Sequence, residues 1–321
     1  MLQVRDFTSD SEAWDAFAQT VGASFRCAFN ATSAWQLEHH LVYELHRLEL
    51  FESDRKIGQC AVGVGNRWRV FADGLQLADA ARWREVMLAV LEHLGPGAYV
   101  YGSDWSLEPS READIQALAE VSLDEVYRTN LEVVDFRNWP TWESYYRGLS
   151  KNVRRNVTKS EKSAATSEII IDRRPLNALR LCAMRYATFR RKALAKGFAM
   201  RTFRSLLRSF AMRRFYEFGV YRVGGRTLAA YGGVRFGPNS FFLEAGATAR
   251  NDGAAWRLLI VIMERAWRES CGKGVFALGS DDGSQEGTKA WDGLTRSRRA
   301  CRAKPIPISI LRFRYQRRPS V

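Results

Sequence analysis

Three consecutive strand-like segments in the second half of the chain restrict its fold more than any other feature. They cover residues 218–223, 226–236 and 240–249. Two short turns, Gly224-Gly225 and Gly237-Pro238-Asn239, separate them. Turns this short join antiparallel neighbours, so the segments predict a strand meander. A helix from about residue 254 to 270 and a strand over 275–278 are expected to follow, which indicates a layered α/β arrangement.

The first half of the chain repeats this order in a shorter form, as helix, meander, helix and strand. Its expected strands cover residues 47–51, 57–64, 68–72 and 98–101, with a helix over 80–93. In the second half, helices are expected over 142–162, 175–195 and 202–216. We place the domain boundary near Asn138-Trp139-Pro140, which gives domains of residues 1–137 and 138–321 with related topology.

Charge divides the chain at nearly the same place. Residues 1–146 contain 12 Lys and Arg against 23 Asp and Glu, whereas residues 147–321 contain 37 against 12. The acidic half and the basic half are expected to attract each other, or the basic half to bind an anionic partner.

Several classes of protein are disfavoured by the sequence. The longest aliphatic run, Leu258 to Met263, is far shorter than the roughly 20 residues of a membrane-spanning helix. No signal peptide is recognisable at the N-terminus, and the five scattered cysteines have neither metal-ligand nor redox spacing. We therefore expect a cytoplasmic protein with reduced thiols and no metal site.

A glycine-containing loop between the last meander strand and the next helix is a candidate anion site. Backbone N–H groups and the positive end of the helix dipole can bind a pyrophosphate there. Arg250, Gly253 and Ala255 fit the acyl-CoA loop of the GNAT family, Gln/Arg-x-x-Gly-x-Gly/Ala, which this segment resembles. The cofactor-binding candidates are thus Arg250, Gly253, Ala254 and Ala255. A side chain at position 253 is expected to enter the phosphate space.

Two further segments resemble the FemAB-like and BioF2-like acyltransferases. Residues 142–159 read WESYYRGLSKNVRRNVTK, and residues 277–291 read ALGSDDGSQEGTKAW. The resemblance implies two GNAT-like domains, each a mixed, mostly antiparallel sheet flanked by helices, with the acidic domain degenerate. It also implies that the basic domain is an N- or O-acyltransferase. Such an enzyme moves an acyl group from acyl-CoA to an amine or hydroxyl of a small or envelope-precursor acceptor.

Candidate side chains for this chemistry come from several elements. Glu244 lies inside an apolar strand, where burial is expected to raise its pKa toward that of a general base, or where it pairs with an arginine. Asp281 follows a strand end and is the second catalytic candidate. The substrate-binding candidates are Lys151, Arg154, Arg155, Tyr231 and Lys289.

Two alternatives remain open at this point. The basic half favours an aminoacyl-tRNA-dependent transferase of the Fem type, with tRNA as a partner. A non-enzymatic binder of nucleic acid or of an anionic membrane is the other alternative. It leaves the glycine loop and Glu244 unexplained.

Overall fold

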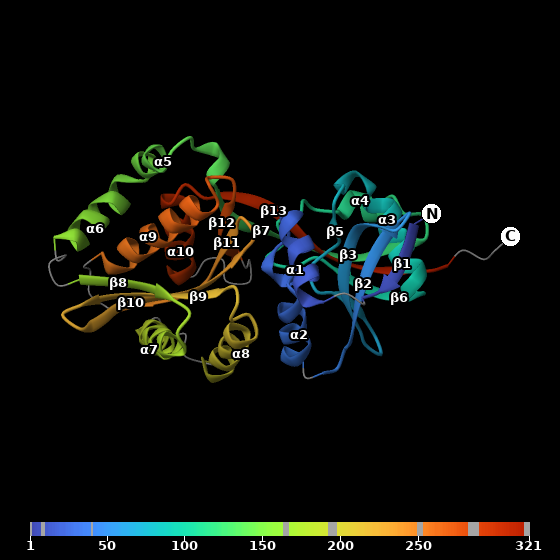
Figure 1. Ribbon diagram of the computed structural model, residues 1–321, viewed down its shortest axis with the longest axis horizontal. Helices are drawn as coiled ribbons and strands as arrows, with labels where there is room; N and C mark the ends of the chain where they lie inside the picture. Colours follow the sequence, from blue (N-terminus) through green and yellow to red (C-terminus); the bar gives the residue numbers. More distant parts are fainter. Residues whose placement is uncertain are drawn as a thin grey trace. The chain divides into compact units, whose positions relative to one another are not determined.

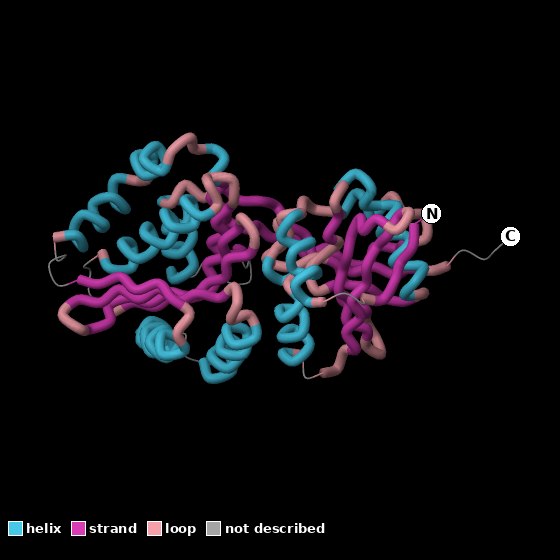
Figure 2. Tube along the Cα trace, viewed as in Figure 1, coloured by secondary structure: helices cyan, strands magenta, loops and turns pink. Residues whose placement is uncertain are grey.

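The computed structural model describes residues 2–7, 10–39, 41–162, 167–191, 198–248, 253–281 and 289–317. For Pro175, Asp281 and residues 289–294 it describes the backbone but not the side chain. The chain forms two compact units, the first from Met1–Leu131 with Ile306–Val321, and the second from Glu132–Pro305. Figure 2 shows that strands lie at the centre of each unit and that helices cover them.

The first unit is built on a mixed sheet. Its strands, in spatial order, are β1 (Leu2–Asp6), β2 (Glu44–Glu52), β3 (Arg55–Val64), β4 (Arg69–Phe71), β6 (Gly97–Tyr101), β13 (Lys304–Tyr315) and β7 (Val121–Asp135). A short strand, β5 (Gln76–Leu77), pairs with β3. The helices are α1 (Ser11–Thr20), α2 (Phe29–Glu38), α3 (Trp83–Leu94) and α4 (Glu112–Gln116), with short 3₁₀ turns at Phe25–Cys27 and Ala80–Arg82.

Helix α3 contributes most of the helical side chains in the core of this unit. Trp83, Val86, Met87, Val90 and Leu91 recur at intervals of one, three and four and are almost fully buried. This spacing places them on one face of the helix, which packs against the strands.

The second unit also has a sheet between two layers of helices. Its strands, in spatial order, are β8 (Ser167–Asp172), β9 (Tyr216–Val223), β10 (Arg226–Phe236), β11 (Asn239–Ala247) and β12 (Val275–Asp281), followed by β7. Its helices are α5 (Trp142–Gly148), α6 (Lys151–Glu161), α7 (Pro175–Arg191), α8 (Phe198–Ala211), α9 (Ala254–Glu269) and α10 (Lys289–Ala300), with a 3₁₀ turn at Phe136–Asn138. In Figure 1, α7 and α8 lie on one face of this sheet, and α6 and α9 lie on the other.

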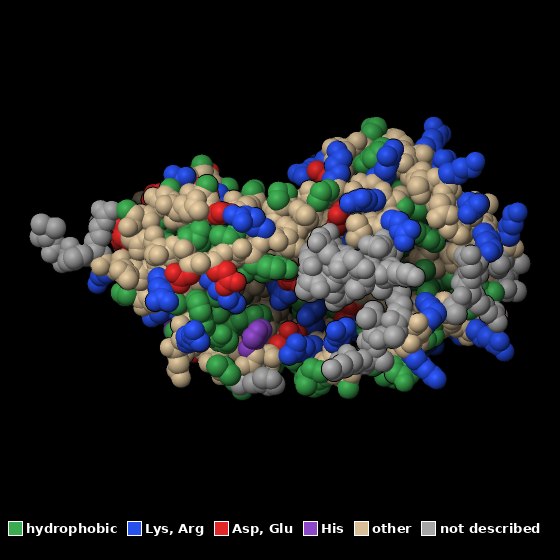
Figure 3. Space-filling model, turned by 180° about the vertical axis from the view of Figure 1, so that it is seen from behind, with side chains coloured by type: hydrophobic (Ala, Val, Ile, Leu, Met, Phe, Trp, Pro, Cys, Tyr) green, Lys and Arg blue, Asp and Glu red, His purple; other side chains and the backbone are tan. Residues whose placement is uncertain are grey.

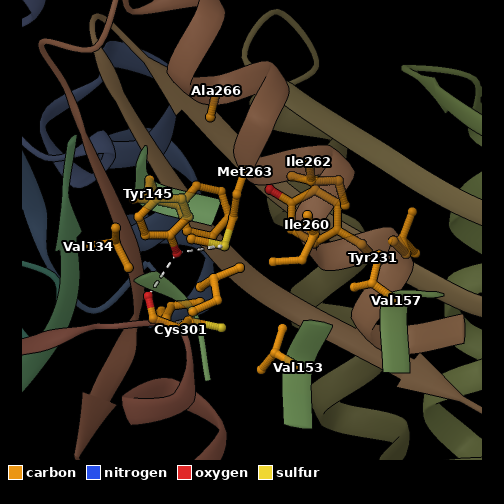
Figure 4. Packing of buried hydrophobic residues seen from close by; sticks show 14 of the residues in the cluster. Val134, Tyr145, Val153, Val157, Tyr231, Ile260, Ile262, Met263, Ala266 and Cys301 are labelled. Carbon is orange, nitrogen blue, oxygen red and sulfur yellow. Dashed lines mark hydrogen bonds between the residues drawn. The ribbon is translucent and has the colours of Figure 1, made fainter. Parts of the chain in front are cut away.

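The core of the second unit lies mainly under α9. Leu258, Ile262 and Met263 pack there with strand residues and with α5. Figure 4 shows Tyr145 of α5 inside this cluster, where its hydroxyl donates to the Cys301 carbonyl at 2.7 Å. This hydrogen bond satisfies a buried polar group and joins α5 to the end of α10.

The expected fold class is confirmed, because each unit has a mixed, largely antiparallel sheet flanked by helices. The helix expected over 142–162 is two helices, because Ser150 caps a new helix with its side chain at the Val153 amide. The proposed boundary at 137/138 lies near the observed division at 131/132. Residues 306–321, which we assigned to the second domain, belong to the first unit.

The same order of elements occurs twice along the chain. Strand β1, two helices, β2–β3–β4, α3, β6, α4 and β7 correspond in order to β8, two helices, β9–β10–β11, α9, β12, α10 and β13. The final strand of the second series, β13, pairs with β6, where Leu311 is opposite Tyr101. The first unit therefore contains a strand from the end of the chain.

Candidate functional site

Strands β11 and β12 of the second unit start as neighbours and then separate. Their parallel register consists of two pairs, Ser240 with Phe276 and Phe241 with Ala277. Strand β11 continues to Ala247, and no further pairs join the described residues of these two strands. Beyond Phe241, no described strand pairs with β11 on the side of β12, and the Ala247 N–H and C=O bind the Thr188 hydroxyl instead.

A β-bulge lies where the two strands separate. Gly232 of β10 pairs with Glu244, and Gly233 pairs with Phe242, so Leu243 is an extra residue on β11. Bulges bend a strand and redirect its side chains, and they are frequent beside active sites.

A cavity of about 330 Å³ opens along this edge of β11. Its lining residues come from the end of α7, from β10 and β11, from the start of α9 and from α10: Thr188, Arg191, Ala229, Ala230, Tyr231, Phe242, Ala245, Gly246, Ala247, Ala255, Trp256, Leu258, Leu259 and Ser297. Small side chains on β10 and β11 leave this space open, and the walls are mainly apolar. We call it the splay cavity. Its volume lies in the range that holds small ligands.

The first turn of α9 forms one end of the splay cavity. Gly253 is the N-cap residue with a left-handed φ of +77°, and it provides no side-chain cap. The amides of a helix start carry a partial positive charge and bind anions when no side chain caps them. Ala255, which lines the cavity, is exposed at this helix start.

Gly253 is also needed for the close packing of α9 against α6, a role that sequence reasoning did not identify. A Cβ atom at this position would lie 2.8 Å from the carbonyl carbon and 3.3 Å from the Cα of Asn156 in α6. A side chain at position 253 would therefore not enter the phosphate space as expected. It would instead collide with the backbone of α6, because α6 and α9 pack closely here.

Helix α6 presents cations beside this helix start. Val153, Val157 and Ser160 are its buried residues, whereas the candidates Lys151, Arg154 and Arg155 are exposed. A surface depression of about 470 Å³ is lined by Arg155, Asn156, Thr158, Lys159 and Lys162. Because the Asn156 backbone abuts Gly253, this cationic surface and the N-terminus of α9 are adjacent.

Glu244 lies on the sheet face that α7 and α8 cover. Its Oε2 accepts hydrogen bonds from Arg185 Nη1 of α7 at 2.6 Å and from Ser205 Oγ of α8 at 2.5 Å. The side chains of Arg185 and Glu244 are each 8% exposed. Of the two roles considered from sequence, the structure shows the pairing with an arginine, and the catalytic role stays a prediction.

The hydroxyl of Tyr216 is a polar group beside Glu244 that sequence reasoning missed. It is buried and has no hydrogen-bond partner among the residues described. A Cβ atom on Gly232 would approach this hydroxyl, and Gly232 is the strand partner of Glu244. Burial, and then the nearby Glu244 carboxylate, raise the pKa of Tyr216 well above its usual value. The hydroxyl is therefore neutral and can act only as a donor or acceptor.

The remaining candidates from the sequence are Tyr231, Arg250, Asp281 and Lys289. The ring of Tyr231 is buried in the core and forms part of the wall of the splay cavity, 5.0 Å from the ring of Phe242. Arg250 lies outside the described residues, as do the side chains of Asp281 and Lys289. The backbones of Asp281 and Lys289 end β12 and begin α10.

The first unit has a related pair of strands with a different chemistry at its end. β4 and β6 pair in parallel through Arg69–Tyr99 and Val70–Val100. Immediately after these strands, Ser103 Oγ donates to Asp73 Oδ1 at 2.5 Å. Here a buried hydrogen bond joins the two chain segments, in contrast to the open edge of β11.

Carboxylates line the cavity of about 210 Å³ beside these residues. Asp73 is buried, and burial raises its pKa. Glu108 accepts from the Tyr101 hydroxyl at 2.6 Å and from Arg111 Nε at 2.9 Å, and burial raises the pKa of Glu108 to about 7. Sequence reasoning missed this cluster because its members lie far apart along the chain.

The described residues contain no group of three or more His, Cys, Asp or Glu arranged to hold a metal ion. None of the described helices is long and apolar enough to span a membrane.

Comparisons with known proteins identify a domain match and structures with a similar fold. Residues 148–282 match the family model of an acetyltransferase (GNAT) domain. A search of the curated proteins finds no significant match. The fold is similar to that of FemX, with a TM-score of 0.69, 9% identity, and 97% of each chain covered. It is also similar to a conserved protein of unknown function from Bacteroides thetaiotaomicron, with a TM-score of 0.63, 12% identity, and 98% and 100% of the two chains covered.

A third similar structure is L-PGS from Bacillus licheniformis, with a TM-score of 0.53, 11% identity, and coverage of 96% of this chain and 92% of that one. At these identities the structures establish a shared fold over nearly the whole chain. The family match covers the residues that form α6, the meander, the start of α9 and β12. Residues 148–282 of the second unit therefore match an acetyltransferase (GNAT) domain, and the whole chain shares its fold with the solved structures.

Proposed function

We propose that the chain transfers an acyl group from acyl-CoA to an amine or hydroxyl of a small or envelope-precursor acceptor, using the second unit. The observation that carries this proposal is the separation of β11 from β12 beside the splay cavity. An open strand edge next to an apolar cavity suits a donor that combines an amide-containing arm with an acyl chain.

The positive charges near the start of α9 also suit the phosphates of an acyl-CoA donor. The N-terminus of α9 provides amides for a pyrophosphate, and Arg155 and Lys159 of α6 lie on the adjacent surface. The donor site is therefore assigned to the second unit.

The transfer itself requires few protein groups. The acceptor nitrogen or oxygen attacks the thioester carbonyl carbon, the C–S bond breaks, and the thiolate takes up a proton. Backbone N–H groups on the open edge of β11 are suitable donors for the oxyanion that forms. Glu244 and Asp281 remain the candidates for removing the acceptor proton, with Glu244 positioned by Arg185 and Ser205.

Isothermal calorimetry with acetyl-CoA and longer acyl-CoAs tests this proposal. Ala255→Glu places a carboxylate at an exposed position of the α9 start, where a negative charge favours the helix but repels phosphate. Ala255→Gln is the matched neutral control. We expect Ala255→Glu to weaken acyl-CoA binding at least tenfold without lowering the melting temperature, and Ala255→Gln to have a smaller effect. Equal binding by the parent and both variants would overturn the assignment of the phosphate site.

The second candidate function is an aminoacyl-tRNA-dependent transfer. Its support is the similarity in fold to FemX over 97% of each chain, together with the positive charge of residues 147–321. Charged tRNA is therefore included as a ligand in the same experiment. Binding of charged tRNA without binding of any acyl-CoA would favour this second function.

A further inference from the structure

Large hydrophobic side chains are exposed together on α7 and α8 of the second unit. The chain has eleven such residues among those described, and seven of them lie on these two helices. The seven are Leu176, Leu179, Tyr186, Met200, Phe203, Leu206 and Phe210. Scattered exposed hydrophobic residues are common in proteins, but a gathered set indicates a binding surface. We call this set the α7–α8 apolar surface.

Helix α8 has its polar and apolar sides reversed relative to an ordinary surface helix. Ser205 is buried and donates to Glu244, whereas Phe203 and Phe210 are 62% and 74% exposed. Met200, Phe203, Leu206 and Phe210 recur at intervals of three and four, so they share one side of the helix. Packing among the described residues of the unit therefore does not explain these side chains.

All charged residues in the segment of the sequence that contains α7 and α8 are positively charged. Residues 173–214 contain thirteen Lys and Arg and no Asp or Glu. Arg201 and Arg204 are exposed on α8 itself, next to the apolar side chains in sequence. Figure 3 shows hydrophobic and basic side chains next to one another along the lower edge of this unit.

We propose that the α7–α8 apolar surface docks on an anionic lipid bilayer. Aromatic and aliphatic side chains flanked by arginines, without acidic residues, are typical of helices that lie in the interface of a membrane. The arginines add attraction to anionic headgroups, which is screened by salt. A nucleic acid also attracts arginines, but it does not account for the seven exposed apolar side chains.

This inference is independent of the proposed acyl transfer. It rests on seven exposed side chains of α7 and α8, none of which lines the splay cavity, although Thr188 and Arg191 at the end of α7 do line that cavity. Bilayer docking predicts that the protein binds its membrane through side chains that do not line the donor site.

Vesicle co-sedimentation of the full chain tests the proposal. The probes are vesicles of phosphatidylcholine alone and of phosphatidylcholine mixed with phosphatidylglycerol. Phe203→Ser/Phe210→Ser is expected to reduce the partition coefficient on the mixed vesicles at least about tenfold, because two aromatic side chains lose their burial in lipid. The matched control is Leu41→Ser/Val42→Ser, which removes two residues of the first unit that are 62% and 67% exposed. The control is expected to bind like the parent.

Two further measurements distinguish the contribution of charge to vesicle binding from that of apolar burial. Arg201→Glu/Arg204→Glu is expected to weaken binding to the mixed vesicles, and added salt is expected to weaken binding of the parent. Circular dichroism verifies that each variant is folded. The proposal is overturned if the parent does not sediment with the mixed vesicles, or if Phe203→Ser/Phe210→Ser sediments like the parent. A parent dimer that this variant converts to a monomer, without vesicle binding, would assign the surface to self-association instead.

Discussion

The ion pair between Arg185 and Glu244 provides the sharpest test of how the second unit is stabilised. Both side chains are 8% exposed, and the 2.6 Å contact joins α7 to β11. Replacing either residue by leucine leaves the other charge buried without its partner. Such a change costs about 3–5 kcal/mol of unfolding free energy, which corresponds to a fall in melting temperature of roughly 10 °C for a unit of this size.

The double variant Arg185→Leu/Glu244→Leu is expected to behave differently. Replacing both charges by apolar residues removes the penalty of the unpaired charge, so its unfolding free energy is expected within about 1 kcal/mol of the parent. The coupling energy of the cycle is then several kcal/mol. Urea denaturation of the four proteins, followed by circular dichroism, measures it.

A surface pair provides the matched control for this cycle. Arg222 and Glu168 also connect two elements of the second unit, but their side chains are 27% and 58% exposed. The same leucine substitutions at this pair are expected to give a coupling below about 1 kcal/mol. If the cycle at Arg185 and Glu244 gives an equally small value, the pair is not desolvated and the reasoning is refuted. Because the double variant is expected to fold, its acyl-transfer activity also shows whether Glu244 is a base or only a structural partner.

Four further outcomes follow from the described contacts. Gly253→Ala is expected to lower the unfolding free energy by about 2 kcal/mol, measured in urea, because φ is +77° and the new Cβ meets the Asn156 backbone. Gly95→Ala, which has a positive φ but no neighbour within 4 Å of its Cβ, is expected to lose less. Burial raises the pKa of Glu108 to about 7, so the contribution of this residue to stability is present at low pH and is lost as pH rises from about 4.5 through 7. The expected loss is about 3 kcal/mol of unfolding free energy. Melting temperatures measured at several pH values are expected to decline less steeply for Glu108→Gln than for the parent. Tyr216→Phe removes a buried hydroxyl that has no hydrogen-bond partner among the described residues, so calorimetry is expected to show no loss of stability. A loss above about 1 kcal/mol would mean that this hydroxyl has a partner.

Local signals predicted most of the order of elements in both units, although β1 and α10 were not predicted. Glycine and proline turns mark the ends of β9, β10 and β11, and Gly95-Pro96 marks the end of α3. These features act within a few residues, so they can be read directly from the sequence. The break between α5 and α6 was missed because Ser150 was read as part of a continuous helix rather than as a cap.

Contacts between distant residues were beyond this kind of reasoning. The pairing of β13 with β6 joins residues about 200 positions apart, and nothing in either segment specifies the partner. Similarly, the strand pattern around Glu244 indicated burial but did not identify Arg185, which lies on a helix 59 residues away. The loop at Gly253 was recognised from its glycine, whereas its close contact with α6 required the structure.

The place of β13 has a consequence for how the protein is synthesised. The first unit needs residues 306–321 to complete its sheet, yet residues 132–305 emerge from the ribosome before them. At typical translation rates of about 5–20 residues per second, these 174 or so residues delay completion of that sheet by roughly 10–35 s. During this interval the nascent chain has an open strand edge at β6, which is a site for mispairing with other chains or for recognition by a chaperone. An N-terminal fragment that stops at residue 137 remains permanently in this incomplete state.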